Sequence, residues 1–178
     1  MCQFKSALCL KDRVFVPDYD SHDRMLDELN IPDDMRHATT TFVRVEVVPP
    51  DGDKFSNPMG WNVKVDQDVL PDWFMPEVDH PRIRQAVAEW CATHVLREGI
   101  HTVKDGKWIV GSNATVDARG NATVEARGNA TVKAYDNATV ILPKYKQTTQ
   151  EIVLYDETIC INHRTHTIRS AISWEQIQ

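Results

Sequence analysis

The sequence predicts a mixed α/β protein, in which a small α+β N-terminal region packs on a short parallel β-solenoid with C-terminal capping strands. An octapeptide repeat, SNATVDAR, GNATVEAR, GNATVKAY and DNATVILP, fills residues 112–143. Strand-like alternation occurs earlier in the chain, and one long amphipathic helix lies between the two patterns. We expect the N-terminal region over residues 1–99, the solenoid repeats over 100–143 and the capping strands over 144–178.

The N-terminal region contains signals for a hairpin, a short helix and two further strands. Residues 4–16 hold two apolar runs separated by a polar pair, which predicts the hairpin. Ser21 is a favourable N-cap residue for the short helix that follows it. Alternating valines in residues 42–48 predict a half-buried strand, and a second alternating run begins at Trp61.

The long helix is expected to run from about Pro81 to Glu98. Asp79 or His80 can cap its first turn, Pro81 suits position N1, and Gly99 suits the position after its last turn. Because one face of the helix is apolar, we expect that face to pack on the first coil of the solenoid. The apolar stripe consists of Ile83, Val87, Trp90, Cys91 and Val95.

Two architectures produce a period of eight: an antiparallel meander with Gly-Asn turns, or a coil in which each repeat is one strand and one corner. In a meander, a Gly120-Asn121 turn would pair Arg119 with Ala122, so the apolar face would flip at every strand. A coil keeps the small apolar residues inward throughout, so the repeat predicts a solenoid. Its structural positions are Asn113, Val116, Asn121, Val124, Asn129, Val132, Asn137 and Val140.

Two octapeptides per coil predict a flattened cross-section in which alternate repeats stack. This arrangement places Asn113 over Asn129 and Asp117 over Lys133, the second being a favourable ion pair. We also expect each repeat asparagine to adopt the positive φ of a corner while its amide stacks along the coil.

Weaker repeats extend the pattern on its N-terminal side. Trp108 falls in the phase of the repeat valines and, one step earlier, Ile100 does the same, so the solenoid should begin near residue 100. After Pro143 we expect a polar loop and then strands that cap the far end, because an open coil end exposes unpaired strand edges.

Composition indicates a folded protein, which we expect to be cytoplasmic and to bind no cofactor. Hydrophobic residues make up 42% of the 178 residues, and no apolar run approaches the roughly 20 residues of a membrane helix. The start of the chain has no signal-peptide core. Four widely spaced cysteines fit a reducing compartment; they are Cys2, Cys9, Cys91 and Cys160.

Acidic residues are concentrated in the N-terminal half. Residues 1–80 contain 16 Asp and Glu against 8 Lys and Arg, a net charge of −8, whereas residues 81–178 contain 10 against 12, a net charge of +2. Negative charge repels phosphates, so nucleic acid is not expected as a direct ligand. The acidic half favours a basic protein surface as partner, with a solvated, solubilising surface as the alternative.

Three segments stand out by their composition: Asp20-Ser21-His22, the VDQDVLPDWF run over residues 65–74 and the NATV octapeptides. Together they resemble a set of uncharacterised proteins encoded by bacteriophages and prophages, and the second segment is the most specific. The resemblance implies a phage or prophage context, and it brings no catalytic residue.

One weak zinc candidate lies near the C-terminus. Cys160, His163 and His166 have a spacing that lets one hairpin supply three ligands. A structural zinc site needs a fourth ligand, which this segment lacks. A buried cysteine beside two turn histidines is the alternative, and we expect no bound metal.

A second metal candidate is the acidic run Asp66, Asp68 and Asp72, because hard divalent cations prefer carboxylate ligands. A solvated strand end with turn carboxylates is the alternative. The sequence contains no glycine-rich phosphate loop, GxSxG or HExxH motif, so we expect a non-enzyme.

We therefore expect a non-catalytic protein-binding factor. Its concrete form is an anti-defence inhibitor of phage origin, whose acidic surface blocks a host nucleic-acid enzyme such as a defence nuclease. The alternatives are a structural protein whose solenoid ends or edges oligomerise or join a particle, and a metal-dependent enzyme that uses the acidic run. The candidate contact residues are Asp18, Asp20, Asp23, Asp66, Asp68 and Asp72, with Asp33, Asp34, Asp51 and Asp53 as further members.

Overall fold

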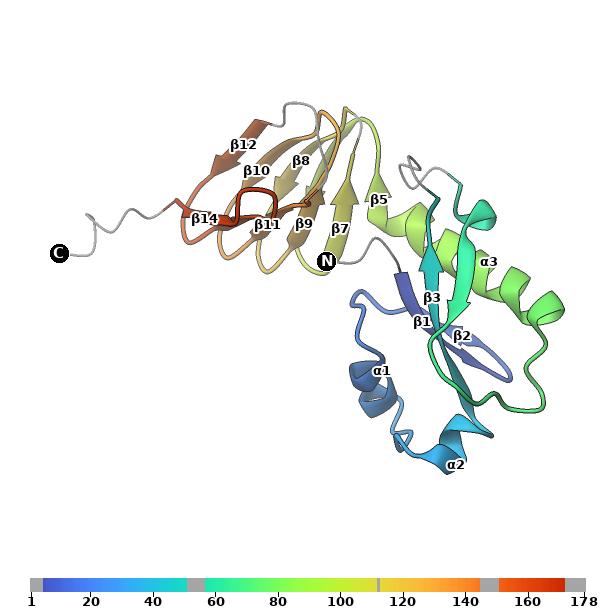
Figure 1. The fold of residues 1–178 in the computed structure, drawn as a ribbon. Coiled ribbons are helices and arrows are strands. Elements are labelled where there is room, and N and C mark those ends of the chain that lie inside the picture. Colours follow the sequence, from blue (N-terminus) through green and yellow to red (C-terminus); the bar gives the residue numbers. More distant parts are fainter. Residues whose placement is uncertain (1–4, 51–56, 112, 145–150, 172–178) are drawn as a thin grey trace. The chain divides into compact units, whose positions relative to one another are not determined.

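A computed structural model describes residues 5–50, 57–111, 113–144 and 151–171. The chain forms two compact units, residues 2–92 and residues 93–178, which we call the N-terminal unit and the solenoid unit (Figure 1). The predicted fold class is confirmed: an α+β region precedes a parallel β-solenoid of about four turns over residues 95–162.

The N-terminal unit contains a four-stranded antiparallel sheet in the order β2-β1-β3-β4. Its strands are β1 (Lys5–Leu10), β2 (Val14–Phe15), β3 (Phe42–Val48) and β4 (Asn62–Val65). Its helices are α1 (His22–Glu28), α2 (Met35–Ala38), the 3-10 turn η1 (Pro58–Gly60) and α3 (Pro76–His94). The hairpin, the short helix and both alternating strands are present as predicted.

Helix α1 begins where the sequence predicts. The Ser21 hydroxyl accepts a hydrogen bond from the Arg24 N–H at 3.3 Å, which caps the first turn. Met25 and Leu26 are buried and join a hydrophobic cluster with Leu8 of β1 and Phe42 of β3. The apolar side of α1 therefore covers one face of the sheet.

Helix α3 begins and ends earlier than the sequence predicts. It starts at Pro76, which suits N1 as well as Pro81 does, and Pro81 lies inside the helix. Asp79 accepts a hydrogen bond from the Met75 N–H at 2.8 Å and so closes the first turn. The helix stops at His94 because the following two residues join the solenoid as a strand.

Hydrogen bonds fasten α3 to the N-terminal sheet. The Arg84 side chain donates to the Trp61 carbonyl at 2.7 Å, and the Arg82 side chain donates to the Leu10 carbonyl at 3.4 Å. The buried residues of α3 include four members of the predicted stripe: Ile83, Val87, Trp90 and Cys91.

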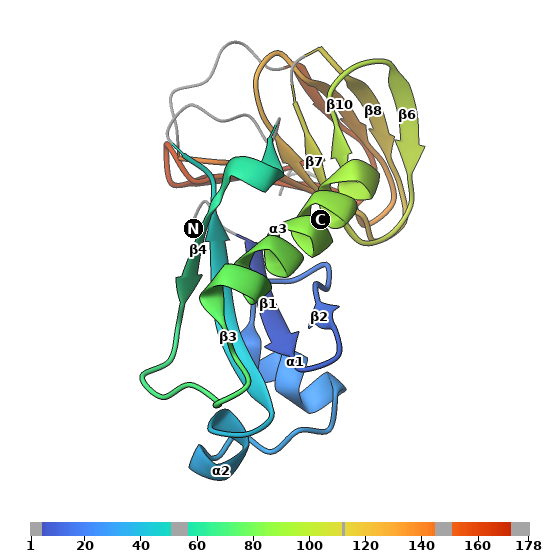
Figure 2. The same cartoon turned by 90° about the vertical axis from the view of Figure 1, so that its right-hand side faces the viewer.

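The solenoid unit is built of two sheets, in the orders β12-β10-β8-β6 and β14-β13-β11-β9-β7-β5. Its first strands are β5 (Val95–Leu96), β6 (Ile100–Val103), β7 (Lys107–Val110), β8 (Thr115–Ala118) and β9 (Thr123–Ala126). The remaining strands are β10 (Thr131–Ala134), β11 (Thr139–Leu142), β12 (Glu151–Leu154), β13 (Ile159–Asn162) and β14 (Thr167–Ser170). Figure 2 shows β6, β8 and β10 side by side, and all three run parallel.

The predicted facing of the repeat is confirmed. Val116, Val124, Val132 and Val140 and the alanines beside them have no exposed surface, and they form one continuous core. Thr131 pairs with Thr115, and Lys133 lies directly opposite Asp117, as the coil arrangement predicts. These pairings exclude the meander, whose neighbouring strands would run antiparallel.

The prediction for Ile100 is wrong by one residue. Ile100 pairs with Thr115, so it occupies an outward position and is 85% exposed, while His101 takes the valine phase beside Val116. The corner between β6 and β7 contains three residues, 104–106, whereas each corner from β7 to β11 contains four. This missing residue shifts the phase of β6.

The solenoid is also longer than the predicted range 100–143. Strand β5 pairs parallel with β7, so the first rung begins at Val95. Strands β12 and β13 pair parallel with β10 and β11, so they are further rungs of the coil. Strand β14, which was also expected among the capping strands, departs from the coil, because it runs antiparallel to its neighbour β13.

The corners correct the prediction for the repeat asparagines. The residue with positive φ is the one before the asparagine: Gly120 at 57°, Gly128 at 59° and Asp136 at 58°. The predicted amide stacking is present in one pair, since Asn129 Nδ2 donates to Asn113 Oδ1 at 3.5 Å. Glycine therefore supplies the backbone freedom of these corners.

Within the part of the chain that the structure describes, no helix is long and apolar enough to cross a membrane.

Candidate functional sites

Asp20 serves the interior of the N-terminal unit. Its carboxylate accepts from Lys5 Nζ at 2.8 Å and from the Ser6 N–H at 3.2 Å. Lys5 is only 2% exposed, and its ammonium lies 4.7 Å from the centre of a Trp90 ring. A buried ammonium needs a negative partner. Asp20 therefore has a structural role that the sequence prediction missed.

Asp18 is exposed, but its carboxylate is also engaged. It accepts a hydrogen bond from the Trp90 indole N–H at 3.1 Å, which ties the segment before α1 to helix α3. Asp18 and Asp20 thus hold Trp90 and Lys5 in place. The isolated lysine in the apolar run of β1 was the sequence signal for this arrangement, because a buried lysine implies a nearby carboxylate.

A contact between His22 and Asp66 brings two distant segments together. His22 Nδ1 lies 3.3 Å from Asp66 Oδ2, and His22 Nε2 lies 3.2 Å from the Val45 carbonyl oxygen. The start of α1 therefore lies beside the end of β4. Asp23 and Asp68 follow closely in these two segments and are exposed, so two further predicted acidic residues lie beside this contact.

The Gln67 side chain holds the VDQDVLPDWF run against neighbouring backbone groups. Its side-chain oxygen accepts from the Arg44 N–H at 2.8 Å. Its side-chain nitrogen lies 3.1 Å from the Ala38 carbonyl oxygen and 2.7 Å from that of Val69. One side-chain amide therefore bonds to backbone groups that lie beyond Val45–Val65, the last pair between β3 and β4, where these two strands no longer satisfy each other.

The aromatic end of the same run also has a structural role. The Trp73 indole N–H donates to the Thr40 carbonyl at 2.8 Å, and Pro71 and Phe74 are buried. Asp72 lies between them and is exposed. The motif thus fastens residues 66–74 to the connection between α2 and β3. Its exposed side chains include Asp68, Val69, Leu70 and Asp72.

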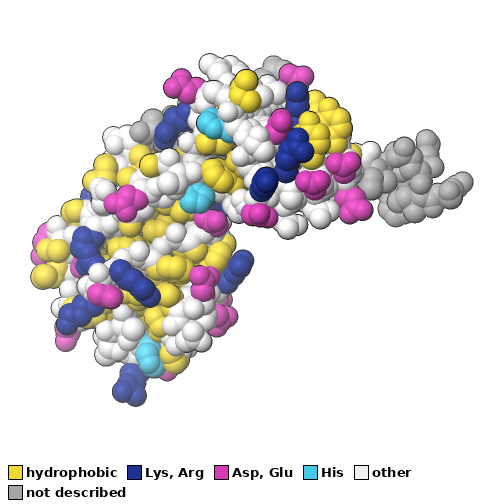
Figure 3. All heavy atoms as spheres, turned by 180° about the vertical axis from the view of Figure 1, so that it is seen from behind, with side chains coloured by type: hydrophobic (Ala, Val, Ile, Leu, Met, Phe, Trp, Pro, Cys, Tyr) yellow, Lys and Arg dark blue, Asp and Glu magenta, His cyan; other side chains and the backbone are white. Residues whose placement is uncertain are grey.

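Exposed apolar side chains lie within this fastened loop and its continuation into α3, and one more, Met35, lies in α2, whose last residue Ala38 contacts Gln67. The large ones are Met35 (69% exposed), Val69 (43%), Leu70 (40%), Met75 (48%) and Val78 (47%). Residues 66–79 also contain five Asp or Glu and no Lys or Arg. Four of these carboxylates are exposed, whereas Asp79 is buried and paired with Arg82. We call residues 66–79 together with Met35 the acidic-apolar surface. Figure 3 shows one face of the molecule, on which hydrophobic side chains gather between charged ones over the N-terminal unit.

The described residues contain no group of three His, Cys, Asp or Glu side chains that could hold a metal ion. In the acidic run, Asp66 is engaged with His22. In the C-terminal triplet, Cys160 is buried among inward residues, whereas His166 lies in an exposed turn with φ of 55°. Neither predicted triplet converges.

The solenoid carries a surface stack of aromatic and cationic side chains. The Tyr135 and Tyr155 rings lie parallel, with centres 4.6 Å apart, and the Arg119 guanidinium lies 4.5 Å from the Tyr135 ring centre. Stacked rungs place these residues one above the other along one corner. This ladder is preorganised, because its members hold each other's side chains.

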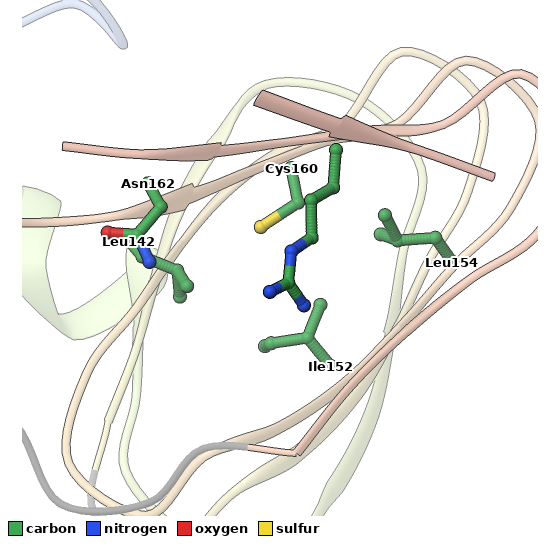
Figure 4. Close-up of a pocket in the computed structure, with 6 residues that line it drawn as sticks. Leu142, Ile152, Leu154, Cys160 and Asn162 are labelled. Atoms are coloured by element: carbon green, nitrogen blue, oxygen red, sulfur yellow. The ribbon is translucent and has the colours of Figure 1, made fainter. Parts of the chain in front are cut away.

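A pocket of about 220 Å³ lies beside the last rungs of the solenoid core. It is lined by Leu142, Ile152, Leu154, Cys160, Asn162 and Arg169 (Figure 4). Burial raises the pKa of the Cys160 thiol, and the Arg169 guanidinium opposes this shift. The thiol is therefore protonated at neutral pH, so the pocket presents an apolar wall. The sequence pattern gave no signal for Arg169 in this position.

The chain matches no protein-family model, no curated protein and no solved structure. The resemblance to phage and prophage proteins stays a prediction. Asp51 and Asp53, which belonged to the wider acidic set, lie outside the described residues.

Proposed function

We propose that this chain is a non-catalytic protein-binding factor of phage or prophage origin. It acts in the host cytoplasm and inhibits a host nucleic-acid enzyme, such as a defence nuclease, by occupying the enzyme's basic groove. The observation that carries the proposal is the acidic-apolar surface, where exposed Leu70, Met75 and Val78 lie in a segment with four exposed carboxylates and no Lys or Arg.

Such a surface has the composition of a protein interface. Apolar side chains at the centre of an interface supply affinity, whereas charges at its rim guide the approach and select the partner. The rim here is acidic, so it attracts a cationic surface and repels phosphates. Fastening by Gln67 and Trp73 keeps the loop ordered before binding, which lowers the entropy cost of association.

Not all predicted acidic residues suit a contact role. Asp23, Asp68 and Asp72 are exposed and lie in or beside the acidic-apolar surface. Asp66 is half exposed and engaged with His22. We therefore assign contacts to the first three, and structural roles to Asp18 and Asp20.

The test compares three baits in a host lysate. The wild-type chain should retain a nucleic-acid enzyme in low salt and release it as salt rises, because screening weakens charge-assisted contacts. The bait with Asp23→Lys, Asp68→Lys and Asp72→Lys should retain none of that enzyme, whereas the control Glu157→Lys, an exposed residue of the solenoid unit, should behave as wild type.

The retained enzyme is then purified and its nuclease activity is measured with each variant. Inhibition by wild type and by Glu157→Lys, but not by the triple variant, supports the proposal. Retention of the same proteins by all three baits, or retention of no nucleic-acid enzyme, contradicts it.

Self-assembly through the solenoid is the second candidate function. Within the described residues, the sheet β12-β10-β8-β6 ends in two edge strands, and such edges can pair with another chain. Light scattering over a hundredfold range of concentration separates the two functions: a constant monomer mass contradicts assembly. A metal-dependent enzyme is the least favoured alternative, because Asp66 faces His22 and not the other two carboxylates of the run.

A further inference from the structure

The pocket at the last rungs of the solenoid has the chemistry of a site for a small amphipathic anion. Leu142, Ile152, Leu154 and Cys160 supply apolar surface, and Figure 4 shows these side chains facing a common space. They occupy inward positions of the last rungs, since Ile152 pairs with Val132 and Cys160 with Val140. The wall is therefore a continuation of the hydrophobic core.

Arg169 adds one cationic group to this apolar wall. It lies directly opposite Cys160 in the antiparallel pair of β13 and β14, and opposite residues of such a pair point to the same face. Within residues 5–50, 57–111, 113–144 and 151–171, no carboxylate forms an ion pair with Arg169. A guanidinium binds a carboxylate through two parallel hydrogen bonds.

We propose that this pocket binds a small aliphatic monocarboxylate, with the hydrocarbon chain against the apolar wall and the carboxylate on Arg169. The Asn162 side-chain amide also lines the pocket and can donate to the second oxygen of the carboxylate. The site is distinct from the acidic-apolar surface, so it is independent of the proposed inhibitory function.

The cavity volume limits how much of a ligand the pocket can enclose. A volume of about 220 Å³ is below the range of about 300–1,000 Å³ for drug-sized ligands. At about 30 Å³ for each water-sized group, it has room for about seven such groups. A chain of about five or six carbons fills this space, whereas the remaining carbons of a long fatty acid would lie outside it and gain no burial there. Binding is non-covalent, because burial keeps the Cys160 thiol protonated.

The test measures binding of hexanoate by the full-length protein, with hexan-1-ol and hexylamine as ligands of equal chain length. Isothermal titration and ligand-observed NMR should show hexanoate binding at least tenfold tighter than either uncharged or cationic analogue. Arg169→Gln should weaken hexanoate binding about tenfold and leave hexan-1-ol binding unchanged. The control Arg164→Gln, an exposed residue of the turn before β14, should match wild type.

A second variant tests the cavity itself. Ile152→Phe fills apolar space in the pocket and should abolish binding of all three ligands, with a thermal melt close to that of wild type. Equal affinities for hexanoate and hexan-1-ol overturn the assignment of Arg169. No hexanoate binding by the wild-type protein, or unchanged binding by Ile152→Phe, overturns the site.

Discussion

The carboxylate of Asp136 accepts a hydrogen bond from the backbone N–H of Gly120, 2.8 Å away and one coil earlier in the solenoid. Asp156 repeats the contact one coil later, where it accepts from the Asp136 N–H at 3.2 Å. All three residues have positive φ. The corner is thus a ladder in which each carboxylate binds the exposed amide of the preceding coil, and this ladder helps to hold the rungs in register.

Gly120→Ala should destabilise the solenoid unit by about 1–3 kcal/mol. The backbone of Gly120 has φ of 57°, and an added Cβ would lie 2.7 Å from the Lys104 carbonyl oxygen. Gly111→Ala is the matched control, because its Cβ would meet its nearest neighbour, Arg127 Cβ, at 4.0 Å. Urea denaturation of both variants measures the difference. Equal midpoints would show that the corner relaxes without cost.

Val132→Asp should unfold the solenoid unit or cost several kcal/mol, because its carboxylate would enter a dry core without a partner. Val132 has no exposed surface. Thr123→Asp is the control: Thr123 points outward and pairs with Lys107, so the new charge gains a favourable neighbour. Thermal melts followed by circular dichroism give the comparison. Melting temperatures that fall alike would refute the inward assignment.

Asp20→Asn should cost about 3 kcal/mol, because it leaves the buried Lys5 ammonium without its anion. The side chains of Lys5 and Asp20 are 3% and 25% exposed. Asp23→Asn, on the surface of α1, should change stability by less than about 0.5 kcal/mol. Chemical denaturation distinguishes the two. If Asp20→Asn is as stable as Asp23→Asn, the ion pair contributes nothing to folding.

Alkaline pH should destabilise the protein through Cys9. Burial, with a smaller contribution from the Asp79 carboxylate, raises the pKa of the Cys9 thiol from 9.0 to about 12, although the Arg82 guanidinium opposes the shift. Between these values the unfolded chain loses the proton and the folded chain keeps it, so stability falls as pH rises. The loss is about 1.4 kcal/mol per pH unit for one thiol.

Urea midpoints measured from pH 8 to pH 11 test this dependence. Cys9→Ala removes the thiol and should show a shallower decline than wild type over the same range. Other groups that titrate there contribute equally to both proteins. Parallel curves would therefore contradict the role of Cys9.

The solenoid was predictable because its period is short and its side chains alternate strictly. The inward position of Val116 and the pairing of Asp117 with Lys133 follow from that alternation alone. The phase of Ile100 was not predictable in this way. The corner before β7 is one residue shorter than the next corners, and no repeat asparagine marks its position in the sequence. The prediction of where α3 starts was wrong because the sequence offers two equivalent signals: Pro76 and Pro81 both satisfy the preference for proline at N1.

The roles of the aspartates depended on tertiary contacts that sequence spacing does not contain. Asp20 and Asp23 have similar neighbours in the chain, yet Asp20 faces Lys5 and Asp23 faces solvent. The partner of Asp20 lies 15 residues away and on a different element. The same limit applies to Arg169, which lies in the pocket because β14 turns back along β13.

The regular step of the coil makes the length of this protein adjustable in whole units. Val132 pairs with Val116 and Val140 with Val124, so each added pair of octapeptides supplies one complete turn. A turn lengthens the stack by about 4.8 Å, the spacing of adjacent strands. Each turn contacts only the turns above and below it, so duplication or loss of one leaves the others unchanged. The length of the solenoid can therefore change by whole turns, in evolution or by design, without any change to the residues at either end.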